Sequence, residues 1–233
     1  MKRLLLTGLL LLAVALGVTG GYFTGDYLGT PLPTASGNAV PIGDVSPSEP
    51  SLPVKTPVPN NLPALTVDDL DFRKQTFTVH QESLPPVRLS VRVPAGWEKS
   101  VNKKTPGEVK FLDSLRERGV RVESGFRVEL TPAQQRDRLI AQLKSSLPYE
   151  DNLQIVSQTD DTVTGDDGQS RPISTLIYTY IPTQTVRYVM VRWVATAGDG
   201  LANVEMSITG LPQDAKALEL VADEAAQSVT PED

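Results

Sequence analysis

Side chains that commonly carry acid–base, thiol or metal chemistry are scarce in this sequence. Its 233 residues include one histidine, His80, and no cysteine. The chain therefore forms no disulfide, no thiolate metal site and no lipid anchor attached through cysteine. A lone histidine needs an orienting partner and a nucleophile for acid–base catalysis, and no Gly-x-Ser-x-Gly elbow supplies a serine. We therefore expect a surface histidine, no catalytic residues, no metal ligands and no cofactor.

Four carboxylates gather in a predicted hairpin, around a Gly-Asp-Asp-Gly turn. They are Asp160, Asp161, Asp166 and Asp167. Oxygen-rich loops of this kind bind Ca²⁺, whereas Asp and Gly are also ordinary turn residues. The spacing matches no EF-hand loop, so we interpret the segment as a hairpin turn, with a calcium site as the alternative.

Positive charge concentrates between residues 99 and 121. This stretch holds seven Lys or Arg residues against three Asp or Glu residues, a local charge of +4 in a chain of net charge −6. Because the chain as a whole is acidic, it is a poor candidate for nucleic-acid binding. We interpret the stretch as a solvated loop and sheet edge; the alternative is a docking surface for an anionic partner or the membrane surface. The candidate docking residues are Lys99, Lys103, Lys104, Lys110, Arg116 and Arg118.

The first 29 residues have the pattern of a membrane-targeting segment. Lys2 and Arg3 precede an apolar run from Leu4 to Val18 that continues weakly to Phe23. About 20 helical residues span about 30 Å, the thickness of a bilayer core. The positive N-terminal flank is expected to stay in the cytoplasm, which places the rest of the chain outside. We predict an uncleaved signal-anchor and a single-pass cell-membrane protein; a cleaved signal peptide, which would give a secreted protein, is the alternative.

A proline-rich spacer is predicted from residue 30 to residue 67. Nine of the chain's 19 prolines lie between residues 30 and 65, among Ser, Thr, Gly and Asn. Proline lacks an amide donor and fixes φ, so the segment is predicted to be an extended, semi-rigid tether. Residues 68–233 are then expected to form one extracytoplasmic domain.

The predicted domain begins with strand patterns and a helix. Apolar and polar residues alternate over residues 76–82, 87–93 and 121–130, which predicts half-buried strands. In the last of these the apolar residues, Val128 among them, are expected to face inward, and the charged residues, Arg121 and Glu123 among them, to face outward. Residues 108–112 are a further candidate strand. A helix is predicted to begin at Thr131-Pro132 and to stop at Pro148, because Thr caps free N–H groups and Pro suits the first helical position.

Four more strands and a helix complete the pattern. The strands are predicted over residues 153–164, 173–181, 186–197 and 201–209, and the helix follows Gly210. The third of these strands is apolar on both faces, which indicates a central strand with cover on each side. Runs of strands separated by helices favour an α+β fold over a parallel βαβ fold. We predict an antiparallel sheet sandwiched between helices.

A predicted strand ends in the sequence Val-Pro-Ala-Gly-Trp, from Val93 to Trp97. This segment and the order of the elements after it resemble the Mog1/PsbP-like superfamily. Within that superfamily the chain is most similar to the actinobacterial LpqN/LpqT-type envelope proteins, over about residues 75–230. The resemblance implies an exported, membrane-tethered sandwich with an accessory or binding role. It implies no catalytic residues, and that group's cysteine-linked lipid anchor does not carry over because this chain has no cysteine.

These observations favour a membrane-tethered extracytoplasmic accessory or binding domain of the cell envelope. The expected partners are the membrane, through the N-terminal segment, and an envelope protein or amphiphile, but not nucleic acid. One alternative is a lipid or small-molecule carrier with a pocket between sheet and helix. Another is an envelope hydrolase or transferase, for which no nucleophile–base pair is visible in the sequence.

Overall fold

The computed structural model describes residues 52–81 and 84–232. The chain separates between Val54 and Lys55 into two units, of which the second contains all the helices and strands that follow. The predicted signal-anchor and residues 30–51 of the predicted spacer lie outside the described residues. Within the described ranges, no helix has the length and apolar character that a bilayer crossing requires.

The larger of two sheets carries the predicted meander. Among the described residues its strands are β3 (Glu98–Ser100), β4 (Glu108–Leu112), β5 (Gly119–Ser124), β6 (Gln154–Thr164), β7 (Ser170–Tyr180), β8 (Arg187–Val194) and β9 (Val204–Gly210). Their order across the sheet is β3-β4-β5-β9-β8-β7-β6, and every neighbouring pair is antiparallel. The strands predicted in the second half of the chain are therefore confirmed, with ends that differ by a few residues.

The smaller sheet joins the beginning of the domain to its end. It consists of β1 (Phe72–Val79), β2 (Val87–Pro94) and the short β10 (Thr230–Pro231), in the order β1-β2-β10. The sequence predicted one sheet, whereas the described residues form two, because β2 pairs with the C-terminal segment rather than with the meander.

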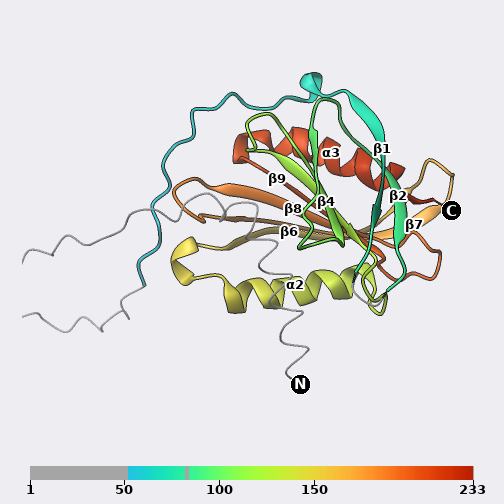
Figure 1. The fold of residues 1–233 in the computed structure, drawn as a ribbon. Helices are drawn as coiled ribbons and strands as arrows, with labels where there is room; N and C mark the ends of the chain where they lie inside the picture. Colours follow the sequence, from blue (N-terminus) through green and yellow to red (C-terminus); the bar gives the residue numbers. More distant parts are fainter. Residues whose placement is uncertain (1–51, 82–83, 233) are drawn as a thin grey trace, which may run out of the picture. The chain divides into compact units, whose positions relative to one another are not determined.

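Two α-helices cover opposite faces of the larger sheet. Helix α2 (Pro132–Ser146) packs on β7 and β8, and α3 (Ala215–Ser228) packs on β2, β8 and β9. Figure 1 shows α3 on one side of the sheet and α2 on the other. Short 3₁₀ turns are η1 (Val67–Asp69), η2 (Tyr149–Asp151) and η3 (Pro212–Asp214). The α+β class with antiparallel sheets is confirmed.

The predicted start of α2 is found in the structure. The Thr131 hydroxyl accepts the amide hydrogen of Gln134 at 3.3 Å, and the Gln134 side chain accepts that of Thr131 at 3.0 Å. This reciprocal pair satisfies two of the amide groups that every helix N-terminus leaves free, and Pro132 occupies the first helical position.

The main core fills the space between the larger sheet, α3 and the β1–β2 ribbon. Its alternating apolar residues include Phe77 of β1 and Phe111 of β4, whose ring centroids lie 5.8 Å apart. Residues 189–194 of β8 are buried without interruption, as the doubly apolar pattern predicted. Helix α3 contributes its buried stripe to this core, with Leu218 fully buried.

The strand predicted over residues 121–130 ends earlier than expected. Strand β5 stops at Ser124, and Gly125 follows with φ +72°, a left-handed conformation that favours glycine. The chain then runs as a loop to the cap of α2, so Val128, predicted to face inward, is 37% exposed. Arg121 and Glu123, predicted to face outward, are instead buried.

Residues 55–66, expected to be part of the spacer, pack along the domain as an extended strap, which is cyan in Figure 1. The amide of Lys55 donates to the carbonyl of Glu150 at 2.8 Å, and that of Val58 donates to the carbonyl of Gln184 at 2.8 Å. The strap therefore begins beside η2 and the β7–β8 loop.

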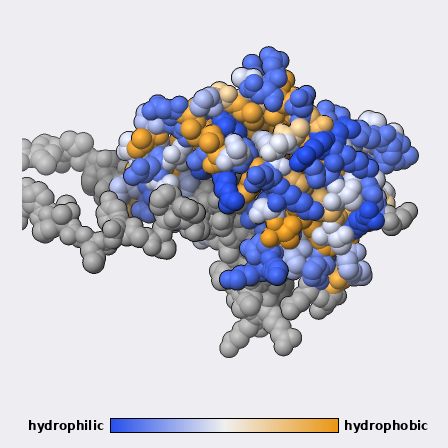
Figure 2. Space-filling model, turned by 45° about the horizontal axis from the view of Figure 1, so that its top comes forward, coloured by the Kyte–Doolittle hydropathy of each residue, from blue (hydrophilic) through white to orange (hydrophobic). Residues whose placement is uncertain are grey.

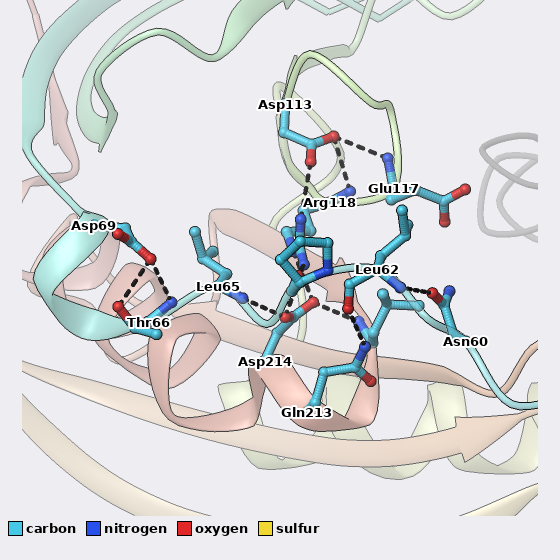
Figure 3. A network of polar contacts seen from close by, with 12 residues as sticks. Asn60, Leu62, Leu65, Thr66, Asp69, Asp113, Glu117, Arg118, Gln213 and Asp214 are labelled. Atoms are coloured by element: carbon cyan, nitrogen blue, oxygen red, sulfur yellow. Dashed lines mark hydrogen bonds and ion pairs between the residues drawn. The ribbon is translucent and has the colours of Figure 1, made fainter.

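The far end of the strap is held by a buried ion pair (Figure 3). The guanidinium of Arg118 donates to the carbonyl of Pro63 at 2.6 Å and to Asp214 Oδ2 at 2.7 Å. Asp214 Oδ1 accepts the amide hydrogen of Leu65 at 2.8 Å. A proline-rich segment makes few hydrogen bonds of its own, so its free carbonyl and amide groups bind to partners that the domain supplies.

Candidate functional site

Four of the six candidate docking residues are exposed. Lys99 lies on β3, Lys103 and Lys104 lie in the β3–β4 turn, and Arg116 lies in the β4–β5 turn. These turns leave opposite ends of the five-residue strand β4, so roughly 14 Å of strand separates them at about 3.4 Å per residue. The structure thus brings Lys99, Lys103 and Lys104 together as one group, the lysine edge, and places Arg116 elsewhere.

The other two candidates are engaged inside the domain. Lys110 Nζ lies 3.1 Å from Glu108 Oε1. The side chain of Arg118 is 7% exposed, and its guanidinium donates hydrogen bonds to Asp214 and to the carbonyl of Pro63 in the strap. Arg118 is buried and Lys110 is only partly exposed, and each would have to give up its carboxylate partner to bind another molecule. We therefore leave Lys110 and Arg118 out of the docking group.

The lysine edge adjoins a meeting point of three loops. The amide of His80, at the end of β1, donates to the carbonyl of Pro106 in the β3–β4 turn at 3.0 Å. The amide of Ser124, at the end of β5, donates to the carbonyl of Gly107 in the same turn at 3.2 Å. The β1–β2 loop, the β3–β4 turn and the β5–α2 loop therefore lie at one end of the domain, which we call the loop end.

His80 itself is exposed, as expected. Among the described residues its side chain makes no hydrogen bond or ion pair, although its backbone holds the β3–β4 turn. The structure thus gives His80 a place beside the lysine edge rather than a partner for acid–base chemistry.

Beneath the loop end, a buried arginine binds three glutamates on the α2-facing side of the larger sheet. Glu108, Glu123 and Glu205 lie side by side on β4, β5 and β9, since the register pairs Glu123 with both of the others. Arg121 donates to Glu123 Oε2 at 2.7 Å and to Glu205 Oε1, and lies 3.4 Å from Glu108 Oε2. We call these four residues the glutamate cluster.

Neutral donors complete the glutamate cluster. The Trp193 indole donates to Glu205 Oε2 at 2.9 Å, and the Gln81 amide donates to Glu123 Oε1 at 3.1 Å. The Thr105 hydroxyl donates to Glu108 Oε1 at 3.0 Å. Because Gln81 and Thr105 belong to two loops of the loop end, the buried cluster and those loops are joined by hydrogen bonds.

The cluster and its neighbour Lys110 together hold one more acid than base. The three carboxylates face Arg121 inside the cluster and Lys110, which lies 3.1 Å from Glu108, beside it. Burial raises the pKa of Glu123 to about 7, against the opposing attraction of Arg121, and the neighbouring Glu205 and Glu108 raise it further. A proton on Glu123 brings the cluster and Lys110 together to electrical neutrality, so burial and the surplus of acids both favour the protonated form of this carboxyl.

Three of the four aspartates of the β6–β7 hairpin pair with arginines, whereas the exposed Asp161 accepts the amide hydrogen of Thr162 at 2.7 Å. Asp160 pairs with Arg136 of α2, and the hairpin turn itself forms at Gly165–Gly168 as predicted. The remaining ion pairs are Asp166–Arg92 and Asp167–Arg171, each at 2.5 Å. In the part of the chain that the structure describes, no group of three or more potential metal ligands occurs.

The alternating pattern did not predict the glutamate cluster because it places Arg121 and Glu123 on a solvent face. A signal was present: charged residues recur two positions apart in β4 and again in β5, as Glu108 with Lys110 and Arg121 with Glu123. Opposite charges at that spacing suit cross-strand pairs once the strands are aligned. The register was the missing information.

Comparisons with known proteins are sparse. No protein-family model and no curated protein matches the sequence. Among solved structures, LpqN, described as involved in cell envelope biogenesis of Mycobacterium tuberculosis, is similar with a TM-score of 0.43 and 16% identity. The match covers 73% of this chain and 99% of the LpqN chain. At this level the similarity supports no conclusion about partner or activity, and membership in the Mog1/PsbP-like superfamily stays a prediction.

Proposed function

We propose that this chain is a membrane-tethered extracytoplasmic binding domain of the cell envelope, which acts without catalysis and docks an anionic partner at the lysine edge. The predicted signal-anchor supports the location. The exposure of Lys99, Lys103 and Lys104 on one edge of the sheet supports the docking role.

The observation that carries the proposal is how the domain uses its cations. Most arginines inside or beside the core are bound to carboxylates, among them Arg92, Arg118, Arg121 and Arg192. The three lysines of the lysine edge take part in no ion pair among the described residues; Lys99 Nζ lies over the Phe77 ring, 5.6 Å from its centroid, and Lys103 and Lys104 have no such contact there. Cations left free on an otherwise acidic protein attract anionic partners and speed their encounter.

The strap fixes the point at which the chain enters the domain, and this point can be compared with the position of the lysine edge. The chain enters the domain at Lys55, whose Nζ lies 2.5 Å from Asp151 and donates to the carbonyl of Pro182 at 2.8 Å. This entry point lies at the end of the sheet where β7 joins β8, whereas the β3–β4 turn lies at the opposite end. The lysine edge therefore lies at the end of the sheet opposite the point where the chain enters the domain.

The proposed location is tested by labelling in intact cells. Tyr149, 59% exposed, is replaced by cysteine in the full-length chain, which has no other cysteine. A membrane-impermeant maleimide is expected to label Tyr149→Cys in unbroken cells, while the buried control Ala222→Cys stays unlabelled before and after lysis. Labelling of Tyr149→Cys only after lysis would overturn the proposed location.

A further inference from the structure

Two loops at the loop end each expose a valine beside positive charge. In the β3–β4 turn, Val101 is 59% exposed and is followed by Lys103 and Lys104. In the β5–α2 loop, Val128 is 37% exposed and is preceded by Arg127. Single exposed apolar residues are ordinary on protein surfaces, and Leu115 beside Arg116 is one in the β4–β5 turn. The loop end differs because it holds two such residues close to three cations.

The two loops are held at the same end of the sheet. Both follow strands that end there, β3 and β5, and the Ser124–Gly107 hydrogen bond joins their bases. Two nearby acids, Glu129 and Asp199, oppose three cations, Lys103, Lys104 and Arg127, which leaves an excess of one positive charge. Glu129 lies 3.7 Å from Arg127 in an exposed pair, and Asp199 of the β8–β9 loop caps the amide of Leu201.

Separate apolar tips flanked by cations suit a lipid surface better than a protein partner. A protein interface needs a buried patch with matching shape, whereas a bilayer interface accepts single side chains and attracts Lys and Arg to anionic headgroups. On the face drawn in Figure 2, hydrophobic residues lie in separate groups among hydrophilic ones rather than in one continuous patch.

We infer that the loop end contacts an anionic bilayer surface, with Val101 and Val128 entering the headgroup region while Lys103, Lys104 and Arg127 bind lipid phosphates. This inference rests on the proposed function and names the anionic partner of the lysine edge. Lysine and arginine side chains near an anionic surface are each attracted only weakly, so three cations give reversible, salt-sensitive contact.

The test uses the absence of native cysteine. Full-length Val101→Cys and Val128→Cys, each labelled with an environment-sensitive dye, are reconstituted into vesicles of phosphatidylcholine, with or without phosphatidylglycerol. We expect a blue-shifted emission at both positions and quenching by a bilayer-embedded nitroxide, only with phosphatidylglycerol and less at high salt. The matched control is Leu115→Cys, 55% exposed in the β4–β5 turn at the other end, which should show neither effect.

Charge reversal tests whether the cations of the loop end, rather than the overall charge of the protein, cause the binding to anionic vesicles. Lys103→Glu, Lys104→Glu and Arg127→Glu together should abolish quenching at position 101. The same charge change at the exposed Arg138, Lys144 and Lys216, on α2 and α3, should preserve it. Equal quenching at positions 101 and 115, or no quenching at 101 with phosphatidylglycerol, would overturn the inference. The maleimide experiment is independent of lipid contact, so such a failure would leave the proposed location standing.

Discussion

Arg118 Nε lies 2.7 Å from Asp214 Oδ2, which joins residues 96 positions apart in the sequence. Asp214 also accepts the amide hydrogens of Leu65 and Leu211. One buried carboxylate thus ties the β4–β5 turn, the strap and the start of α3 together. The strap is consequently part of the folded domain, and the chain enters the domain 13 residues before the boundary expected from the proline pattern, at residue 55 rather than 68.

Removing the arginine of this pair should be costly. Arg118→Ala leaves Asp214 buried without its cation, and breaking a buried ion pair from one side typically costs about 3–5 kcal/mol. Chemical denaturation of the full-length protein measures the loss in the free energy of unfolding. The control Arg116→Ala, an exposed residue in the same turn, should change it by less than about 0.5 kcal/mol. Equal effects of the two variants would show that the Arg118–Asp214 pair does not hold the strap.

Helix α3 should be needed for the core. Leu218 is fully buried, and its side chain lies so close to Gly210 that a Cβ there would approach it to 2.8 Å. Leu218→Ala is expected to lower the free energy of unfolding by about 2–5 kcal/mol and the melting temperature with it. Lys216→Ala, on the exposed side of the same helix, is the matched control. An unchanged melting temperature for Leu218→Ala would mean that α3 is not docked.

The glutamate cluster predicts a specific pH dependence. The pKa of Glu123 is raised from 4.5 to about 7, so the folded state binds more protons than the unfolded state between these values. The contribution of Glu123 to stability is therefore greatest below about pH 4.5 and is lost as the pH rises toward 7. Glu123→Gln, which mimics the protonated acid, should remove this loss.

The measurement compares the two proteins at two pH values. Between about pH 5 and pH 8 the difference in free energy of unfolding should shift in favour of Glu123→Gln by about 2 kcal/mol, since one pKa unit corresponds to about 1.4 kcal/mol. The substitution also weakens the hydrogen bonds of residue 123 to Gln81 and Arg121, but this cost is the same at both pH values. It therefore cancels when the change in the difference between the two proteins is taken. Glu98→Gln, at an exposed position on β3, should show little shift. A parallel pH dependence in wild type and Glu123→Gln would contradict the account of the cluster.

The sequence predicted most elements because local chemistry determines them. In the prediction and in the structure alike, α2 lies between the Thr131 cap and Pro148. The stretch that is apolar on both faces forms β8, an interior strand of the larger sheet. Strand β3 escaped prediction because three polar residues, Glu98 to Ser100, show no apolar alternation. Its pairing with β4 is decided by tertiary context, which a single-sequence pattern does not contain.

The candidate site was predictable only in part. The local charge excess indicated the exposed lysines correctly, but the same count included Arg118, whose burial depends on Asp214 far along the chain. The alternation in β5 showed that Arg121 and Val122 face opposite sides of the sheet. It did not show that glutamates of β4 and β9 lie beside Arg121 on its side of the sheet, which follows from the register of β5 with those two strands.

The most direct test of the central claim is photo-crosslinking from the lysine edge in intact cells. Ser100, exposed on β3 between Lys99 and Val101, is replaced by a photoreactive amino acid in the full-length protein, and Leu115 is replaced likewise as the control. The account predicts envelope adducts from position 100 but not from position 115, and at least a severalfold reduction when Lys103→Glu and Lys104→Glu are added. Adducts of equal yield from both positions, or a yield from position 100 that the charge reversal leaves unchanged, would contradict it.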